Sequence, residues 1–345
     1  MRGSVLRFIK TYQHLQLLLT LSAGLFIAAC SPSSSVVSSV DSLNQRIATT
    51  LQIEPATLSY TPRPASLPSV RQLNPVTSSA GMGLLTSLRL GHCRAGQLIA
   101  ERNSSLGRLE DGLMRFQDDI ALLQALVVCA EMPQSDLIVD ELNQAIADKR
   151  QKLAVDKAYA IATDKALRNA LTVAAQPLQR IDDSAFNPVL TALKKLTNWL
   201  QQPQTNSNLS VWLETLAQSD YLPRLMRSVI AMRLNLIQLQ RQLPPLTAAA
   251  GCNAKVVPER AEILRNVFMR FFINEVQVNL AQLTTQYQQL QPVLASLAEQ
   301  VPQPSLKRYL RQLSEQGQRL AQASKRFVQP WQQLFADCGF TPGAS

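Results

Sequence analysis

The sequence predicts an all-α protein: an elongated helical bundle with long antiparallel helical hairpins, placed after a signal peptide and a proline-rich extended segment. Three observations support this prediction. Apolar residues recur every three or four positions through most of residues 81–345, which is the period of an amphipathic helix. No segment shows the strict apolar–polar alternation of a half-buried strand. The whole chain contains only 12 glycines, and glycine weakens helix interiors.

The first 29 residues have the layout of a secretory signal peptide. Three basic residues precede an apolar run over residues 17–29, and no acidic residue occurs before Cys30. The run is too short to span a bilayer, which takes roughly 20 apolar residues, and it ends in two alanines, as a cleavage site does. We therefore expect residues 1–29 to be removed. The alternative is a plain signal peptide or a core helix with a chance cysteine.

The end of this run, Ile27-Ala28-Ala29-Cys30, resembles the lipobox of bacterial lipoproteins. The resemblance implies that Cys30 becomes the first residue and carries a diacylglyceryl group on its thiol. Two or more acyl chains hold a protein stably on a membrane. Ser31 stands where lipoproteins kept at the inner membrane tend to have aspartate, and this resembles the outer-membrane sorting pattern. We expect a lipid anchor at the periplasmic face of the outer membrane.

The residues after the anchor predict a tether and an extended segment. Residues 30–40 are rich in serine and poor in large apolar side chains, so they should form a flexible tether. A short helix is expected at about residues 41–53. Residues 54–80 exclude a continuous helix because they hold five prolines. The region 41–80 is therefore expected to be a short helix and a proline-rich extended segment.

Residues 81–345 are expected to form one helical domain, with a sub-boundary near residues 177–188. Ser135 should cap a helix that continues to about residue 175, and Pro292 should kink or interrupt another. The turn at residues 301–304 should join the last two helices in an antiparallel hairpin, which allows a coiled-coil-like arrangement. One helix is expected to begin at Gly81 and another near Glu259. The other expected helices span residues 113–127, 135–175, 188–201, 209–218, 222–243 and 305–337.

Four cysteines besides Cys30 predict two disulfides in an oxidising compartment, although four cysteines allow three pairings. We favour Cys93–Cys129 and Cys252–Cys338, because each pair lies within one half of the chain. The midpoint of the first pair falls at a plausible helical turn. The midpoint of the second pair lies about eight residues before the expected turn, so the loop holding Cys252 would have to fold back to reach its partner.

The chain is basic, with a formal net charge of +10. The excess is concentrated in residues 222–330, which hold 14 lysines and arginines against five acids. A basic face could bind an anionic envelope polymer, such as lipid headgroups, lipopolysaccharide or peptidoglycan carboxylates. Nucleic acid is not an expected partner in the periplasm. The alternative is a set of solvated helix faces without a partner.

No catalytic or metal motif stands out, and no cofactor is expected. After cleavage the chain has one histidine, His92, which excludes histidine-rich metal sites. Neighbours on a helix point about 100° apart, so His92 and Cys93 should not act as base and nucleophile. The acidic pairs Asp118-Asp119 and Asp182-Asp183 are expected to cap or solvate helices rather than share a proton. Nucleophile-elbow, P-loop and dinucleotide-binding fingerprints are absent.

Arg102 marks the one candidate site. On a helical projection it continues the apolar stripe of its own helix, so its guanidinium needs a carboxylate, helix C-terminal carbonyls or a bound anion. Under a structural hypothesis it neutralises the helix end, and the following residues only make a turn. Under a functional hypothesis an anion or ligand pocket is lined by Arg102, Asn103, Ser104 and Ser105.

One stretch also carries a family resemblance. Leu88-x-Leu90-Gly91-x-Cys93, then residues 99–107 (Ile-Ala-Glu-Arg-Asn-Ser-Ser-Leu-Gly), then Cys129, resemble an uncharacterised family of gammaproteobacterial lipoproteins, catalogued as domain of unknown function 3080. The resemblance is sharpest over residues 84–130. It supports the lipoprotein address and the extent of the chain, and it implies no activity.

Together these features predict a lipid-anchored periplasmic helical protein that binds or scaffolds in the cell envelope, through an envelope protein or an anionic polymer. The alternative is an enzyme acting on an envelope substrate, with Glu101 and Arg102 in its site. Carboxylates converging in a pocket would favour the enzyme, and a long groove without them would favour the scaffold. Self-association of the helices is a third hypothesis.

Overall fold

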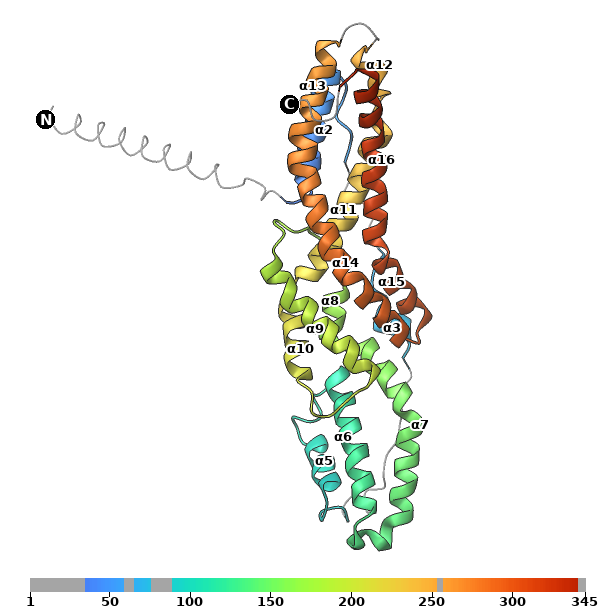
Figure 1. The fold of residues 1–345 in the computed structure, drawn as a ribbon. Helices are drawn as coiled ribbons and strands as arrows, with labels where there is room; N and C mark the ends of the chain where they lie inside the picture. The colour runs from blue at the N-terminus through green and yellow to red at the C-terminus, as the bar shows by residue number, and fades with distance from the viewer. Residues whose placement is uncertain (1–34, 59–64, 76–88, 253–256, 341–345) are drawn as a thin grey trace, which may run out of the picture. The chain divides into compact units, whose positions relative to one another are not determined.

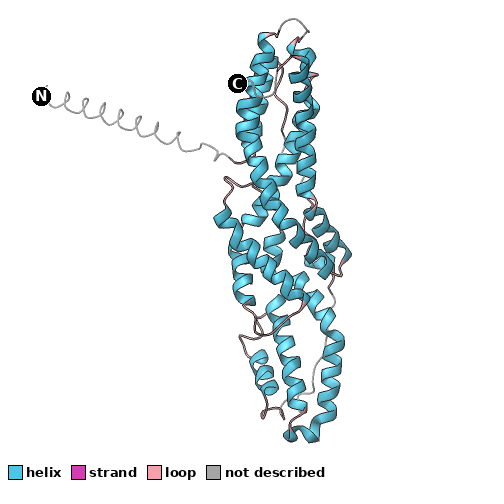
Figure 2. Ribbon diagram, viewed as in Figure 1, coloured by secondary structure: helices cyan, strands magenta, loops and turns pink. Residues whose placement is uncertain are grey.

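The computed structural model describes residues 35–58, 65–75, 89–252 and 257–340. Within these ranges every regular element is a helix and no strand occurs (Figure 2), which confirms the predicted all-α class. The predicted signal peptide, including Cys30, lies outside them, as do parts of the proline-rich segment. The chain divides into two units, Met1–Ser35 and Val36–Ser345, and the described helices belong to the second.

Figure 1 labels the helices of this unit along the chain. The predicted segments 209–218 and 222–243 agree with α10 and α11 to within one residue. The elements are α2 (Ser38–Leu51), α3 (Val70–Leu73), α5 (Arg94–Asn103), α6 (Gly112–Ala130), the 3₁₀-helix η2 (Pro133–Ile138), α7 (Val139–Thr163), α8 (Lys165–Leu171), α9 (Asp183–Gln201), α10 (Leu209–Gln218), α11 (Tyr221–Gln242), α12 (Leu246–Ala250), α13 (Glu259–Val267), the π-helix η3 (Phe268–Val276), α14 (Gln277–Gln300), α15 (Pro304–Ser314) and α16 (Gln316–Asp337).

The long helix expected over residues 135–175 is broken at Asp164, which corrects that prediction. The Asp164 carboxylate accepts hydrogen bonds from the backbone N–H of Leu167 at 2.8 Å and from that of Leu113 at 3.1 Å. It therefore caps α8 and also satisfies an N–H at the start of α6. The hydrogen bond from Leu113, a residue distant in the sequence, explains the break, because no local signal in residues 135–175 opposes a continuous helix.

Other helix starts also differ from the prediction. The helix expected from Gly81 begins, among the described residues, only at Arg94. Ser135 is not an N-cap but lies within η2, and α7 starts at Val139. α9 begins at Asp183 rather than at Pro188, because Asp182 accepts hydrogen bonds from the first backbone N–H groups and caps the helix earlier.

The C-terminal helices pack closely and depart from the predicted pattern in two places. α14 runs through Pro292 without interruption. The single helix expected over residues 305–337 is divided at Glu315 into α15 and α16. Near that division the Tyr287 hydroxyl of α14 donates to the Leu313 carbonyl at 2.6 Å, so a tertiary bond uses a carbonyl of the last α15 turn. α14 packs on α15, and α11 packs on α16.

Two separate groups of buried apolar side chains form the core. The larger group joins most helices from α2 to α16 and includes Trp331, Tyr287 and Phe272. The smaller group, here called the satellite core, lies between α5, α6, η2 and α7. It consists of Leu90, Cys93, Ala95, Leu122, Leu126, Cys129, Ile138, Leu142 and Ile146. The candidate site lies on the helices that share the satellite core.

No single helix among the described residues combines the length and apolar character needed to cross a membrane. Two consecutive helical segments, Gly112–Ala130 and Pro133–Thr163, reach the required length and apolar composition only when they are taken together. They are bent by 106° relative to each other.

Candidate functional site

Arg102 lies in the last turn of α5 and finds its partner on α6. Its guanidinium donates to Oδ1 of Asp119, and Lys149 of α7 donates to the same oxygen at 3.0 Å. The Asp119 side chain is only 11 % exposed. Of the partners expected for Arg102, the structure therefore supplies a carboxylate, and this carboxylate joins three helices.

The two cations determine the ionisation of Asp119. Burial alone would raise the pKa of this carboxyl group, since a charge is costly to desolvate. The charges and hydrogen bonds of Lys149 and Arg102 outweigh burial and hold the pKa below its ordinary value. Asp119 is therefore an anion at neutral pH. One negative charge then faces two positive ones, so the triad Arg102–Asp119–Lys149 carries a net positive charge.

The turn after α5 is built by its own residues. The Ser104 hydroxyl donates to the Glu101 carbonyl at 2.6 Å and accepts from the Gly107 N–H at 3.0 Å. The Asn103 carbonyl accepts from Arg108 at 3.0 Å. This agrees with the structural hypothesis for the turn. Of the four residues in the functional hypothesis, Arg102 and Ser104 line a pocket, whereas Asn103 and Ser105 are not among its lining residues.

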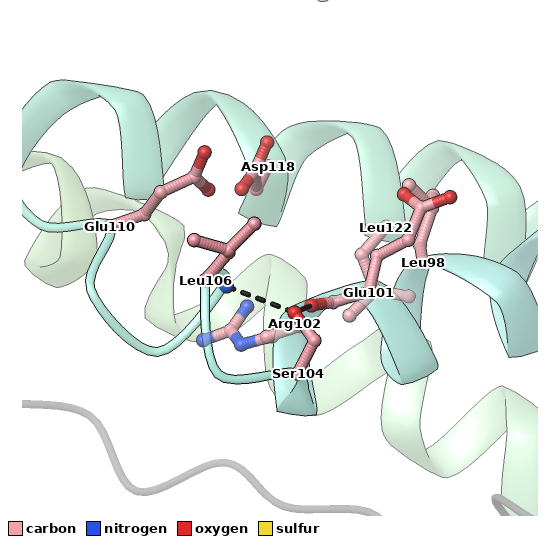
Figure 3. A pocket seen from close by; sticks show the side chains of 9 residues that line it. Leu98, Glu101, Arg102, Ser104, Leu106, Glu110, Asp118 and Leu122 are labelled. Atoms are coloured by element: carbon pink, nitrogen blue, oxygen red, sulfur yellow. Dashed lines mark hydrogen bonds between the residues drawn. The ribbon is translucent and has the colours of Figure 1, made fainter.

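This pocket, here called the turn pocket, has a volume of about 280 Å³ and opens between α5, its following turn and α6 (Figure 3). Its polar side chains include three carboxyl groups and one guanidinium. The lining residues are Leu98, Glu101, Arg102, Ser104, Leu106, Gly107, Glu110, Asp118 and Leu122.

Glu110 and Asp118 point toward each other across the turn pocket in Figure 3. Burial, a hydrogen bond with Glu110 and the charge of Glu110 raise the pKa of Asp118 to about 7, against the opposing charges of Arg115 and Arg102. Asp118 therefore keeps a proton up to about neutral pH, beside the carboxyl group of Glu110. Asp119 is instead the anion of the triad, so the sequence neighbours Asp118 and Asp119 lie in different electrostatic surroundings.

A second cavity of about 470 Å³, here called the interhelix cavity, lies between α6 and α7 and also has Arg102 and Glu110 in its lining. Arg115 lines it and donates to the Gly107 carbonyl at 3.1 Å. Burial and the positive charge of Arg102 lower the pKa of Arg115, against the opposing charges of Asp119, Asp118 and Glu110. The lining residues with acidic or basic side chains are Arg102, Glu110, Asp111, Arg115, Asp119, Lys149, Asp156 and Lys165.

One of the two disulfides joins two helices of the site. Cys93, the residue preceding α5, is bonded to Cys129 in the last turn of α6, with Cα atoms 5.8 Å apart. Cys252 and Cys338 form the second disulfide, with Cα atoms 5.3 Å apart. These are the two pairings that the sequence favoured. The first one fixes α5 against α6 and so positions Glu101 and Arg102.

His92 lies beside the first disulfide rather than in a catalytic pair with Cys93. Its Nδ1 is 3.1 Å from the Arg89 carbonyl, and its Nε2 is 2.9 Å from the Ser135 hydroxyl and 3.8 Å from Cys129 Sγ. Ser135, expected to be a helix cap, is fully buried and donates to the Cys129 carbonyl at 2.7 Å. Both cysteines are oxidised, so neither is a nucleophile in this state.

Part of the basic excess in residues 222–330 is committed within the protein. Glu299 accepts from Lys307 at 2.9 Å and from Arg311 at 3.0 Å, and Arg319 pairs with Glu315. Burial lowers the pKa of Arg233. Three basic side chains of this region, Lys307, Arg311 and Arg319, are thus paired with carboxylates of the same region.

Sequence reasoning found Arg102 and missed its partners. Asp119 could have been found, because it lies on the buried stripe of α6 with Phe116 and Ile120, where a carboxylate calls for a cation. Lys149 and Glu110 carry no such signal. They reach the site only because α7 packs on α6 and the chain turns back before Gly112.

Comparison with known proteins places the chain in one group. A family model described as "Protein of unknown function (DUF3080)" matches residues 40–342. No curated protein and no solved structure matches the chain.

Proposed function

The chain belongs to the family described as "Protein of unknown function (DUF3080)", and we propose that it is a lipid-anchored binding component of the cell envelope. In this proposal Cys30 carries the acyl chains and holds the protein at the periplasmic face of the outer membrane. The binding site comprises the turn pocket and the interhelix cavity, which share Arg102 and Glu110. Its ligand is a segment of an envelope polymer or peptide.

The distribution of charge carries this proposal. The triad Arg102–Asp119–Lys149, with Arg115 beside it, leaves a positive excess at one part of the site. Glu110 and Asp118 form an acidic part, where an ammonium group can take the place of the proton on Asp118. Partly desolvated charges of opposite sign favour a ligand that carries both a carboxylate and an ammonium group. Peptidoglycan peptides have that chemistry.

Calorimetric titration of the full-length protein in detergent with a peptidoglycan stem peptide tests the proposal. Matched probes are the N-acetylated peptide, which lacks the ammonium group, and the amidated peptide, which lacks free carboxylates. We expect the unmodified peptide to bind saturably. Each modified peptide should bind with an affinity about tenfold lower, or lower still. Arg115→Gln and Asp118→Asn should each weaken binding. Arg150→Gln, at an exposed position of α7, is the matched control.

Two results would overturn the binding proposal. One is the absence of saturable binding for all three peptides. The other is equal affinity of wild type, Arg115→Gln and Asp118→Asn for the unmodified peptide.

A second candidate function, an enzyme acting on an envelope substrate, is supported by the convergence of Glu110 and Asp118. A carboxyl group with a pKa of about 7, such as Asp118, beside a second carboxyl group has the acid–base character that hydrolytic chemistry uses. Mass spectrometry of the stem peptide after long incubation separates the two functions. Unchanged peptide supports binding alone, whereas products that disappear with Asp118→Asn support the enzyme.

The proposed lipid anchor has its own test. Cells expressing the wild type or Cys30→Ser are labelled with radioactive palmitate. We expect label only in the wild type, because the proposed thioether needs the Cys30 thiol. A wild-type protein without label, or a labelled Cys30→Ser variant, would contradict the lipid anchor.

A further inference from the structure

The neighbourhood of the Cys93–Cys129 disulfide holds a set of metal-ligating side chains that the binding site does not use. His92 Nε2, Cys93 Sγ and Cys129 Sγ all lie within 4.8 Å of one another. They come from the turn before α5, from the residue preceding α5 and from the last turn of α6. The other disulfide, Cys252–Cys338, is not part of any comparable group in the described ranges.

We propose that reduction of Cys93–Cys129 creates a zinc site in which the two thiolates and His92 Nε2 are the protein ligands. In the reductive step two thiols of a reductant supply two electrons and two protons and leave as their own disulfide. The S–S bond breaks and each cysteine sulfur takes one proton. When Zn²⁺ binds, it displaces both protons, which pass to solvent. A fourth position is left for water or the thioether of Met132.

The orientation of His92 supports this proposal. Its Nδ1 lies 3.1 Å from the Arg89 carbonyl, the type of contact that commonly fixes the tautomer and ring of a zinc-bound histidine. Nε2 lies 2.9 Å from the Ser135 hydroxyl and 3.8 Å from Cys129 Sγ, so a metal ion bound there would replace the contact with Ser135.

The distances fit a tetrahedral ion. With Zn–S of about 2.3 Å and Zn–N of about 2.0–2.1 Å, the N···S edge of a tetrahedral site is about 3.5 Å. His92 Nε2 and Cys129 Sγ are 3.8 Å apart. That edge needs little adjustment, and the main movement on reduction is the separation of the two sulfurs.

The surroundings allow access to the sulfurs. Cys93 is the N-cap residue of α5, where the helix dipole favours a negative charge, and its Sγ lies 3.5 Å from the Leu90 carbonyl oxygen. Both sulfurs belong to the satellite core, but His92 is exposed. A cavity of about 540 Å³ is lined by Cys93, Cys129 and Met132 and provides an approach. The soft donors in this set match the preference of Zn²⁺ for sulfur and imidazole.

Cobalt titration of the full-length protein tests the proposal. The protein is reduced with a phosphine under anaerobic conditions, freed of reductant and titrated with Co²⁺, then with Zn²⁺. We expect one cobalt per reduced chain with the ligand-field and thiolate charge-transfer bands of a tetrahedral site. Zn²⁺ should abolish these bands. The oxidised protein should show none.

Variants identify the ligands. His92→Ala, at an exposed position, should weaken cobalt binding about tenfold or more, and Cys129→Ser should abolish the charge-transfer band. The double variant Cys252→Ser, Cys338→Ser should bind as the wild type does. The proposal is overturned if the reduced wild type shows no tetrahedral bands, if His92→Ala binds equally well, or if the Cys252→Ser, Cys338→Ser variant loses the bands.

Discussion

The guanidinium of Arg102 on α5 donates to the carboxylate of Asp119, seventeen residues further along the chain on α6. Lys149 of α7 donates to the same oxygen at 3.0 Å. Three helices thus meet at one buried carboxylate. Asp119 lines the interhelix cavity, and Arg102 lines both cavities of the candidate site. Removing one member of such a group leaves the others desolvated and unpaired, which costs more than the intact group contributes.

Asp119→Asn should destabilise the protein by about 2–4 kcal/mol, since two partly buried cations lose their counterion. The pKa of Asp119 is lower in the folded protein than in the unfolded chain. Its ionised form therefore stabilises the fold fully above the ordinary carboxyl pKa, and this stabilisation is lost as the pH falls through the lower, folded-state pKa. Urea unfolding at neutral and acidic pH measures both effects. Glu131→Gln, at an exposed position after α6, is the control and should change stability by less than about 0.5 kcal/mol.

Asp118→Asn should remove a pH dependence of opposite sign. Burial and the neighbouring Glu110 raise the pKa of Asp118 from an ordinary 3.8 to about 7 in the folded protein. Between these values the folded state binds more protons, so wild-type stability should fall as pH rises from 4 to 7. Urea unfolding should show the variant gaining stability relative to wild type across this window and remaining level above it. A constant difference from pH 4 to 8 would contradict the raised pKa of Asp118.

Gly112→Ala should destabilise the protein by about 1–3 kcal/mol. Gly112 has φ +57°, and an added Cβ would lie 2.6 Å from Oδ2 of Asp164, the carboxylate that caps α8. Gly91→Ala is a matched control, because an added Cβ there meets nothing within 4 Å. Chemical unfolding of the two variants in parallel compares their free energies of unfolding. Similar stability of both would show that the approach of Asp164 to Gly112 does not constrain this position.

The double variant Cys93→Ser, Cys129→Ser should loosen α5 while leaving the larger core intact. The disulfide closes a loop of 36 residues, and its loss should cost about 3–4 kcal/mol in the chain-entropy account. Because the satellite core is separate from the larger one, hydrogen exchange should rise over residues 94–103 and stay unchanged in α11 and α16. Equal increases in all helices would mean that the two cores unfold as one unit.

Most of the helical content could be predicted from local pattern. The apolar period of residues 209–218 and 222–243 locates α10 and α11 to within a residue, because helix formation depends on neighbours three and four positions away. Among the three possible disulfide pairings, the favoured one rested on each cysteine pair lying within one half of the chain, and the structure has these two pairs. Arg102 stood out because its own helix places it in line with apolar residues.

Contacts between distant segments decided the rest. Asp164 breaks the expected long helix by accepting from the Leu113 N–H, 51 residues earlier in the chain. Lys149 completes the charge group at Asp119 only where α7 packs on α6. The raised pKa of Asp118 depends on its partial burial and on the return of the chain after α5, which brings Glu110 beside it. Periodicity records which face of a helix is buried, but it holds no information about which other helix covers that face, and this is why the site chemistry appears only in the folded protein.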